Sequence, residues 1–201
     1  MIKSFARHRW LSRKLFGGTI KREWKTLQEL WHAGFKAAPQ AYACLENYTL
    51  VMEFVEGEQL LSPKHYAKEN LPERRFFEQL RECVKHSQQL GFAHGDFRRA
   101  NLLIRPNGEP CIIDWATATF HPPKWRLLLR TIHHQQRRSD RFSLIKLLDD
   151  YHPDLVTPEE RRRAQPGSFL RFARFLRYHL YRHGIKEWLG RAHHGGSRKD
   201  K

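Results

Sequence analysis

Three polar side chains in the middle of the chain have the types and the spacing needed for chemistry on a phosphate group. They lie in residues 92–115, FAHGDFRRANLLIRPNGEPCIIDW, where Asn101 follows Asp96 by five positions and Asp114 follows Asn101 by thirteen. A carboxylate can orient a hydroxyl and accept its proton, and an amide with a second carboxylate offers the oxygen ligands that Mg²⁺ prefers. The set therefore predicts phosphoryl transfer from a magnesium nucleotide to a hydroxyl.

The local sequence also predicts how these side chains are positioned. Residues 102–104 and 111–113 are short apolar runs, and the Pro-Asn-Gly sequence at 106–108 is a strong turn signal between them. This pattern predicts a β-hairpin with Asn101 just before its first strand and Asp114 just after its second, so that both metal ligands emerge at one end. The alternative is a structural hairpin with unrelated polar residues around it, which the three matching spacings disfavour.

The H-G-D triplet, Asn101 and the later I-D-W sequence resemble the catalytic core of the protein-kinase-like superfamily. The resemblance implies that Asp96 is the catalytic base, that Asn101 and Asp114 bind Mg²⁺ and that ATP is the phosphate donor. Arg98 is either a catalytic cation that neutralises the migrating phosphoryl group or a solvated arginine. H-G-D with I-D-W is most similar to the bacterial RIO-like and lipopolysaccharide (Kdo/heptose) kinases.

The same resemblance assigns roles near the start of the chain. Lys3 would clamp the α- and β-phosphates and pair with Glu23, on a helix predicted over 19–33 from its apolar periodicity. The alternatives are an ordinary basic residue and a first-turn glutamate favoured by the helix dipole. The Gly-rich loop of the family does not precede Lys3. We expect either a truncated reading frame or another roof over the site, and we favour truncation.

A candidate adenine site follows two strand-like runs, 41–45 and 48–54. The second run continues into a Val-Glu-Gly sequence that resembles the hinge of a kinase. The resemblance implies that backbone groups from Glu53 to Val55 bind the adenine edge, with Met52 at the back of the pocket. An ordinary strand that ends at a glycine turn is the alternative.

Further along the chain, residues 71–90 have the apolar spacing of an amphipathic helix. Asp140, at the start of a helix predicted over 140–151, either accepts backbone N–H bonds from the catalytic loop or serves as an N-terminal helix carboxylate. Gly95 replaces the arginine of regulated protein kinases, and no A-P-E sequence follows, so switching by loop phosphorylation is not expected.

The C-terminal region is basic and helical in pattern. Residues 168–183 alternate aromatic and aliphatic side chains with arginines, which suits either an anionic membrane interface or packing on the C-lobe. We expect a kinase-like domain over 1–185, divided into a partial N-lobe at 1–55 and a C-lobe at 56–185. Residues 186–201 are expected to form a disordered basic tail.

Composition narrows the classes of partner. The net charge of +16 and the pI near 10.2 favour anionic partners such as nucleotides or acidic lipid headgroups, whereas no nucleic-acid-reading motif is present. Three separated cysteines form no C-x-x-C pair, which is typical of a reducing compartment. Without an apolar leader or a long apolar run, we expect a cytoplasmic protein, with possible peripheral contact at the inner membrane.

Together these patterns predict an α+β, protein-kinase-like fold with a truncated N-lobe and a mainly helical C-lobe. The predicted function is an ATP- and Mg²⁺-dependent kinase that phosphorylates a hydroxyl of a lipid-linked glycan or of a protein Ser or Thr. The alternative is a non-catalytic kinase-like module that binds anionic lipid or RNA.

Overall fold

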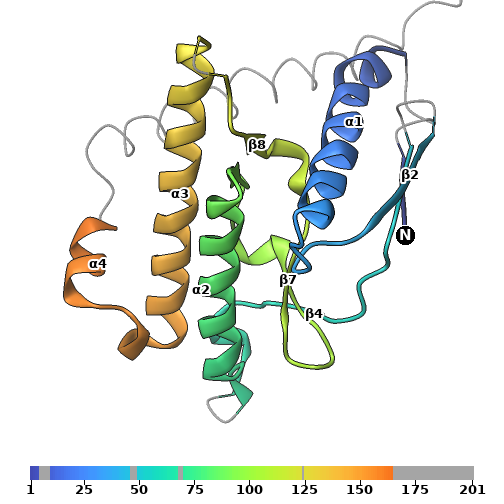
Figure 1. Ribbon diagram of the computed structural model, residues 1–201. Helices are drawn as coiled ribbons and strands as arrows, with labels where there is room; N and C mark the ends of the chain where they lie inside the picture. The colour runs from blue at the N-terminus through green and yellow to red at the C-terminus, as the bar shows by residue number, and fades with distance from the viewer. Residues whose placement is uncertain (5–9, 46–48, 68–69, 124, 165–201) are drawn as a thin grey trace, which may run out of the picture. The chain divides into compact units, whose positions relative to one another are not determined.

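Small antiparallel sheets and long helices alternate along the chain (Figure 1). The computed structural model describes residues 1–4, 10–45, 49–67, 70–123 and 125–164. Its strands and α-helices are β1 (Ile2–Ser4), α1 (Trp10–His32), β2 (Ala41–Leu45), β3 (Thr49–Met52), β4 (Glu58–Gln59), α2 (Arg74–Gln89), β5 (Phe92–Ala93), β6 (Leu102–Ile104), β7 (Pro110–Ile112), β8 (Thr119–Phe120), α3 (Leu127–Tyr151) and α4 (Pro158–Arg163). The α+β class predicted from the sequence is confirmed.

The first sheet holds Lys3 against the helix that carries Glu23. Strands β1 and β2 both pair antiparallel with β3, and Lys3 lies opposite Leu50. Helix α1 buries Leu27 and Leu30 in the core. It begins at Trp10, nine residues before the start predicted from apolar periodicity.

The predicted hairpin is present, with a one-residue shift in its second strand. Leu102 of β6 lies opposite Ile112 of β7, and β4 pairs with the other edge of β6. Beyond the end of the hairpin, the Ile113 N–H donates to the Asn101 carbonyl at 2.9 Å. This bond places Asn101 beside the residue that precedes Asp114, as the predicted metal site requires.

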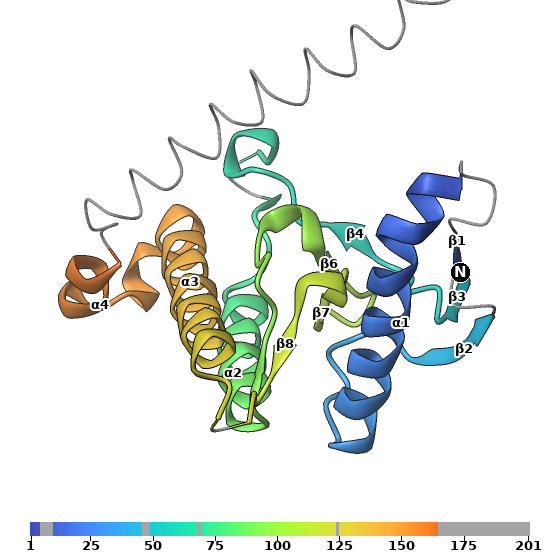
Figure 2. The ribbon, with the colours of Figure 1, turned by 90° about the horizontal axis from the view of Figure 1, so that it is seen from above.

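Helices α2 and α3 lie side by side in both views (Figures 1 and 2). The buried face of α2 includes Phe77, Leu80 and Val84, spaced three and four positions apart as on one face of a helix. The predicted helix start at Asp140 is wrong, because α3 begins at Leu127 and Asp140 lies near its middle. The sequence does resume a helical pattern at about residue 124, close to the observed start.

The C-terminal part that the structure describes ends with α4. A capping box starts this helix, since Thr157 and Glu160 exchange side-chain and backbone hydrogen bonds. The predicted helix at 168–183 and the tail at 186–201 lie outside the described residues, so the proposed domain boundaries stay predictions. No helix in the described ranges combines the length and the apolar character needed to cross a membrane.

Candidate active site

The catalytic carboxylate candidate is fixed by the loop between β5 and β6. The Asn101 Nδ2 group donates to the Asp96 carbonyl at 2.8 Å and to Asp96 Oδ2 at 3.1 Å. The Asn101 side chain is buried, and its amide oxygen accepts no hydrogen bond from the described residues. The amide nitrogen thus holds Asp96 while the amide oxygen stays free for a cation.

Arg98 reaches the same carboxylate. Its Nε lies 3.0 Å from Asp96 Oδ2, and its side chain is mostly exposed. Asp96 Oδ1 has no partner among the described residues, so it is free to accept a bond from an incoming hydroxyl. An exposed ion pair of this kind adds little stability. The ion pair instead positions the Arg98 guanidinium next to the Asp96 carboxylate. Whether Arg98 acts on the phosphoryl group stays a prediction.

Asp114 adopts an unusual backbone conformation two residues after the end of β7. Its φ of 63° is the only positive φ outside glycine in the described part of the chain. A non-glycine residue in this left-handed region costs on the order of 1–3 kcal/mol and is found preferentially at functional sites. The conformation directs the carboxylate toward Lys3, whose Nζ lies 2.9 Å from Asp114 Oδ1.

Lys3 bridges Asp114 and the helix carboxylate. Its Nζ lies 2.8 Å from Glu23 Oε2, and Glu23 is only 1% exposed. Burial lowers the pKa of Lys3, but the two carboxylates outweigh it and hold that pKa above its ordinary value. Burial raises the pKa of Glu23 against the opposing effect of Lys3. The ammonium group is therefore charged and fixed in place.

The side-chain oxygens of Asn101 and Asp114 suit an Mg²⁺ ion that also binds nucleotide phosphates. The Asn101 amide oxygen and the Asp114 carboxylate provide two hard ligands at the open end of the hairpin. In the parts of the chain that the structure describes, no three His, Cys, Asp or Glu side chains are arranged to hold a metal. Mg²⁺ usually takes only one or two protein carboxylates and completes its shell with phosphate oxygens and water. When bound, it would neutralise phosphate charge.

The segment after β3 leaves two backbone groups open to a planar ligand. The Glu53 carbonyl and the Val55 N–H have no hydrogen-bond partner among the described residues, whereas the Glu53 N–H donates to the Gln40 carbonyl. The Glu53 side chain accepts from the Gln40 N–H and pairs with Arg105, each at 3.0 Å. Met52 is buried beside this segment. No sequence signal indicated Arg105, because it meets Glu53 only through the tertiary fold.

His94 is a site residue that sequence reasoning did not select, although it opens the H-G-D triplet. Its Nδ1 accepts from the Asp96 N–H at 3.2 Å, so its Nε2 donates to the Ile113 carbonyl at 3.0 Å. Burial lowers the pKa of His94, which keeps the ring neutral for these two bonds. The ring also lies edge-on against Trp115. His94 thus connects the loop of Asp96 to the strand end that carries Asp114.

Asp140 supports the loop from α3. Its carboxylate accepts the His94 N–H at 2.7 Å and the Gly95 N–H at 3.1 Å, and it is 3% exposed. These bonds match the first of the two roles suggested by the sequence. Burial raises the pKa of Asp140 to about 6, even though both backbone bonds lower it.

This pKa leads to a pH-dependent prediction for Asp140→Asn. The folded-state pKa of about 6 exceeds the ordinary value of 3.8, so the folded chain binds more protons than the unfolded chain between these two pH values. The contribution is complete below pH 3.8 and is lost as the pH rises through about 6. The free energy of unfolding of wild type relative to Asp140→Asn should therefore fall by about 2 kcal/mol between pH 4 and pH 7. Urea unfolding at both pH values measures it, and parallel changes in the two proteins would contradict it.

Gly95 is required by both its conformation and its surroundings. Its φ is +80°, and a Cβ at this position would lie 2.5 Å from the Gln136 Nε2 and 3.0 Å from the Thr117 carbonyl oxygen. Gly34 has nearly the same φ, +83°, with no atom within 4 Å of an added Cβ. We expect Gly34→Ala to cost about 1–2 kcal/mol through its left-handed φ. Gly95→Ala should cost more and also lower activity; equal losses in thermal unfolding would contradict the steric account.

The fold and the site together define a protein-kinase-like domain. A family model described as RIO domain matches residues 3–137, more than half of the chain. The chain belongs to the RIO family. Its sequence departs from regulated kinases at Gly95, where the positive φ and the Thr117 carbonyl oxygen, 3.0 Å from an added Cβ, disfavour any larger residue.

Several named kinases are similar in sequence. The RIO-type serine/threonine-protein kinase Rio2 of Methanocaldococcus jannaschii is 29% identical over 133 residues, which cover 64% of this chain and 47% of the relative. Rio1 of the same organism is 29% identical over 121 residues, covering 59% and 40%. CBL-interacting serine/threonine-protein kinase 5 of Arabidopsis thaliana is 32% identical over 99 residues, covering 48% and 22%. The chain thus spans less than half the length of each of these relatives.

Proposed function

We propose that this chain is an ATP- and Mg²⁺-dependent phosphotransferase acting on a hydroxyl group. The observation that carries the proposal is the Lys3 bridge, in which one ammonium group contacts both Glu23 and Asp114 at under 3 Å. A half-buried cation held between two carboxylates is prepared to receive phosphate oxygens. Similarity to enzymes named serine/threonine-protein kinases supports the same activity.

Each site residue has a role in this mechanism. Asp96 Oδ1 orients the acceptor hydroxyl and takes its proton as the oxygen attacks the γ-phosphorus, while the bond from the γ-phosphorus to the β-phosphate oxygen breaks and ADP leaves. Asn101 and Asp114 would hold Mg²⁺, which would supply positive charge to neutralise the phosphate groups. Lys3 positions the phosphates, and Arg98 stabilises charge beside Asp96. The free Glu53 carbonyl and Val55 N–H bind the adenine edge.

The acceptor is a protein Ser or Thr, or a sugar hydroxyl of a lipopolysaccharide-type glycan. The names of the relatives support the protein acceptor. The basic chain supports the anionic, lipid-linked glycan, because charge complementarity raises the rate of encounter. Since ATP is supplied in the cytoplasm, we propose that the reaction takes place there, with the glycan acceptor presented at the membrane surface.

A phosphoryl-transfer assay tests both the proposed activity and the identity of the acceptor. The purified chain is incubated with Mg²⁺ and γ-labelled ATP, with itself, a casein-type protein or a lipopolysaccharide precursor as acceptor. Label on a protein but never on the glycan would exclude the sugar acceptor, and the reverse result would exclude the protein acceptor. ATP turnover that is the same in wild type and Asp96→Asn would contradict the proposed site.

A further inference from the structure

A cluster of large apolar side chains is exposed at the N-terminal end of α3 and just before the helix begins. Trp125, Leu127 and Leu128 are 70–74% exposed, and Leu129 and Ile132 are 40–41% exposed. We call these five residues the α3 patch. In Figure 1 the corresponding yellow end of α3 extends beyond the end of α2. Neighbouring exposed apolar side chains of this size mark an interaction site, because leaving them in water costs free energy.

Cations accompany the patch. The Arg126 guanidinium lies 4.5 Å from the centre of the Trp125 ring, and Arg130 follows one turn after Leu127. No acidic side chain occurs between Trp125 and Arg138. Apolar side chains with arginines and a tryptophan are the composition of helices that lie in the interface of an anionic bilayer.

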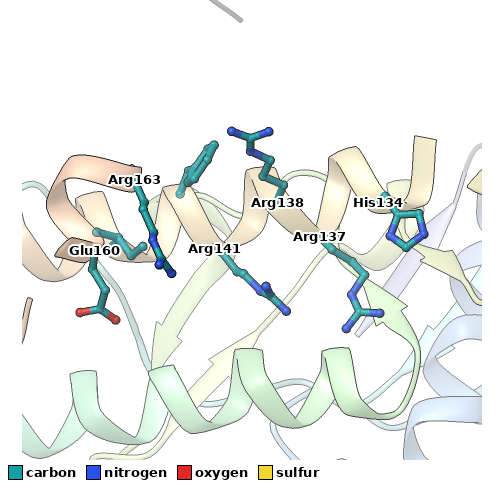
Figure 3. A pocket seen from close by; sticks show the side chains of 8 residues that line it. His134, Arg137, Arg138, Arg141, Glu160 and Arg163 are labelled. Carbon is teal, nitrogen blue, oxygen red and sulfur yellow. The ribbon is translucent and has the colours of Figure 1, made fainter. Parts of the chain in front are cut away.

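The cationic surface continues along α3 into a cavity of about 710 Å³ between α3 and α4 (Figure 3). Arg137, Arg138 and Arg141 line it, and none of them forms an ion pair with a described residue. Burial and the neighbouring Arg141 lower the pKa of Arg137, as expected for crowded cations. Glu160 is the acidic side chain among the described lining residues, and it pairs with Arg81 at 2.7 Å.

Helical spacing aligns the start of the patch with one of these arginines. Leu127 and Arg138 are eleven positions apart, which is about three turns of an α-helix, so both lie on the same side of α3. Leu128 and Ile132 lie further round the helix, and Arg141 lies on the other side of Leu127, where its Nε donates to the Gln88 side chain at 2.6 Å. The cations that flank the patch are therefore Arg126, Arg130 and Arg138.

We infer that the α3 patch docks on an anionic lipid bilayer, with its apolar side chains among the headgroups and upper acyl chains and the flanking Arg126, Arg130 and Arg138 on lipid phosphates. Charge complementarity favours a surface rich in phosphate. The aliphatic side chains Leu127, Leu128 and Ile132 distinguish the bilayer from RNA, because a nucleic-acid partner is bound through cations and stacking aromatics. The inference does not depend on the proposed catalytic activity.

Vesicle flotation of the full chain tests this inference. We expect binding to phosphatidylglycerol-containing vesicles and much weaker binding to phosphatidylcholine vesicles. Leu127→Glu/Leu128→Glu should reduce the bound fraction by about tenfold or more, since it removes apolar contacts and adds negative charge. Tyr42→Glu/Leu45→Glu is the matched control, because both side chains are more than half exposed on β2 and the charge change is the same.

The control variant should bind within about twofold of wild type, and both variants should unfold at the wild-type temperature because the replaced side chains face water. Three results would overturn the inference. These are no binding to anionic vesicles, equal loss of binding in both variants, and a solution dimer that the α3 patch variant abolishes while vesicle binding persists.

Discussion

Replacing Asp96 by Asn should lower phosphoryl-transfer turnover by about 10²–10⁴-fold, the usual contribution of a positioned general base. The Asn101 side chain also bonds the backbone carbonyl of residue 96, at 2.8 Å, so the loop should keep its conformation in the variant. Binding of Mg·ATP should be unchanged, because the metal ligands and Lys3 are intact. Initial-rate measurement of ADP formation, with nucleotide binding measured separately, checks both parts.

Asp150→Asn is the matched control for this prediction. The Asp150 side chain is 38% exposed and lies 3.4 Å from Arg99, whereas Asp96 is 39% exposed and lies 3.0 Å from Arg98. The two substitutions therefore remove the same charge from a similar exposed ion pair. Turnover should be unaffected by Asp150→Asn. A loss of similar size in both variants would attribute the effect to surface charge rather than to base catalysis.

Replacing Lys3 by Met should affect turnover and stability at once. Removal of one positioned phosphate ligand should lower turnover by about 10²–10³-fold. The free energy of unfolding should fall by about 1–3 kcal/mol, because Glu23 stays buried without its cation. Lys85→Met, which removes the exposed pair with Glu82, should change stability by less than about 0.5 kcal/mol and leave turnover intact.

The double variant Lys3→Met/Glu23→Gln separates these two effects. A neutral glutamine no longer needs a buried cation, so most of the lost stability should return. Turnover should stay as low as in the single variant, because no group then positions the phosphates. Recovery of turnover together with stability would mean that Lys3 acts only as a structural counter-ion. Urea unfolding and steady-state kinetics on wild type, Lys3→Met, Lys85→Met and the double variant give the comparison.

The site was predictable from sequence where local motifs and spacing determine it. The turn at 106–108 and its flanking apolar runs indicated the hairpin that brings Asn101 close to Asp114. The helical spacing around Glu23 was consistent with the observed ion pair with Lys3. These features depend on short segments whose side chains point in known directions once the strand or helix is assigned.

Contacts between distant segments could not be predicted in this way. Arg105 pairs with Glu53 across 52 residues, and nothing in the sequence near either residue indicates the other. The helix predicted from Asp140 left out the first turns of α3, although the sequence resumes a helical pattern at about residue 124. The same segment holds the exposed leucines of the α3 patch, whose burial or exposure is decided by tertiary packing.

The RIO family assignment agrees with the resemblance drawn from H-G-D and I-D-W. The lipopolysaccharide acceptor remains part of the proposal. The phosphate-binding geometry does not distinguish a sugar hydroxyl from a serine hydroxyl, because Asp96 needs only an oxygen within hydrogen-bond distance. Acceptor choice therefore depends on surfaces outside the Lys3, Asp96 and Asp114 cluster, and the membrane-docking α3 patch would favour acceptors held at a bilayer.

Thermal unfolding with and without Mg·ATP, on wild type and Asp114→Asn, tests the central claim most directly. A ligand present at about a thousand times its Kd adds about 4 kcal/mol of stability, or about 8–16 °C in Tm for a domain of this size. We expect an upshift of this order in wild type that requires Mg²⁺ and is lost in Asp114→Asn. An equal shift in both proteins, or no shift in either, would contradict a nucleotide site built on Lys3, Asn101 and Asp114.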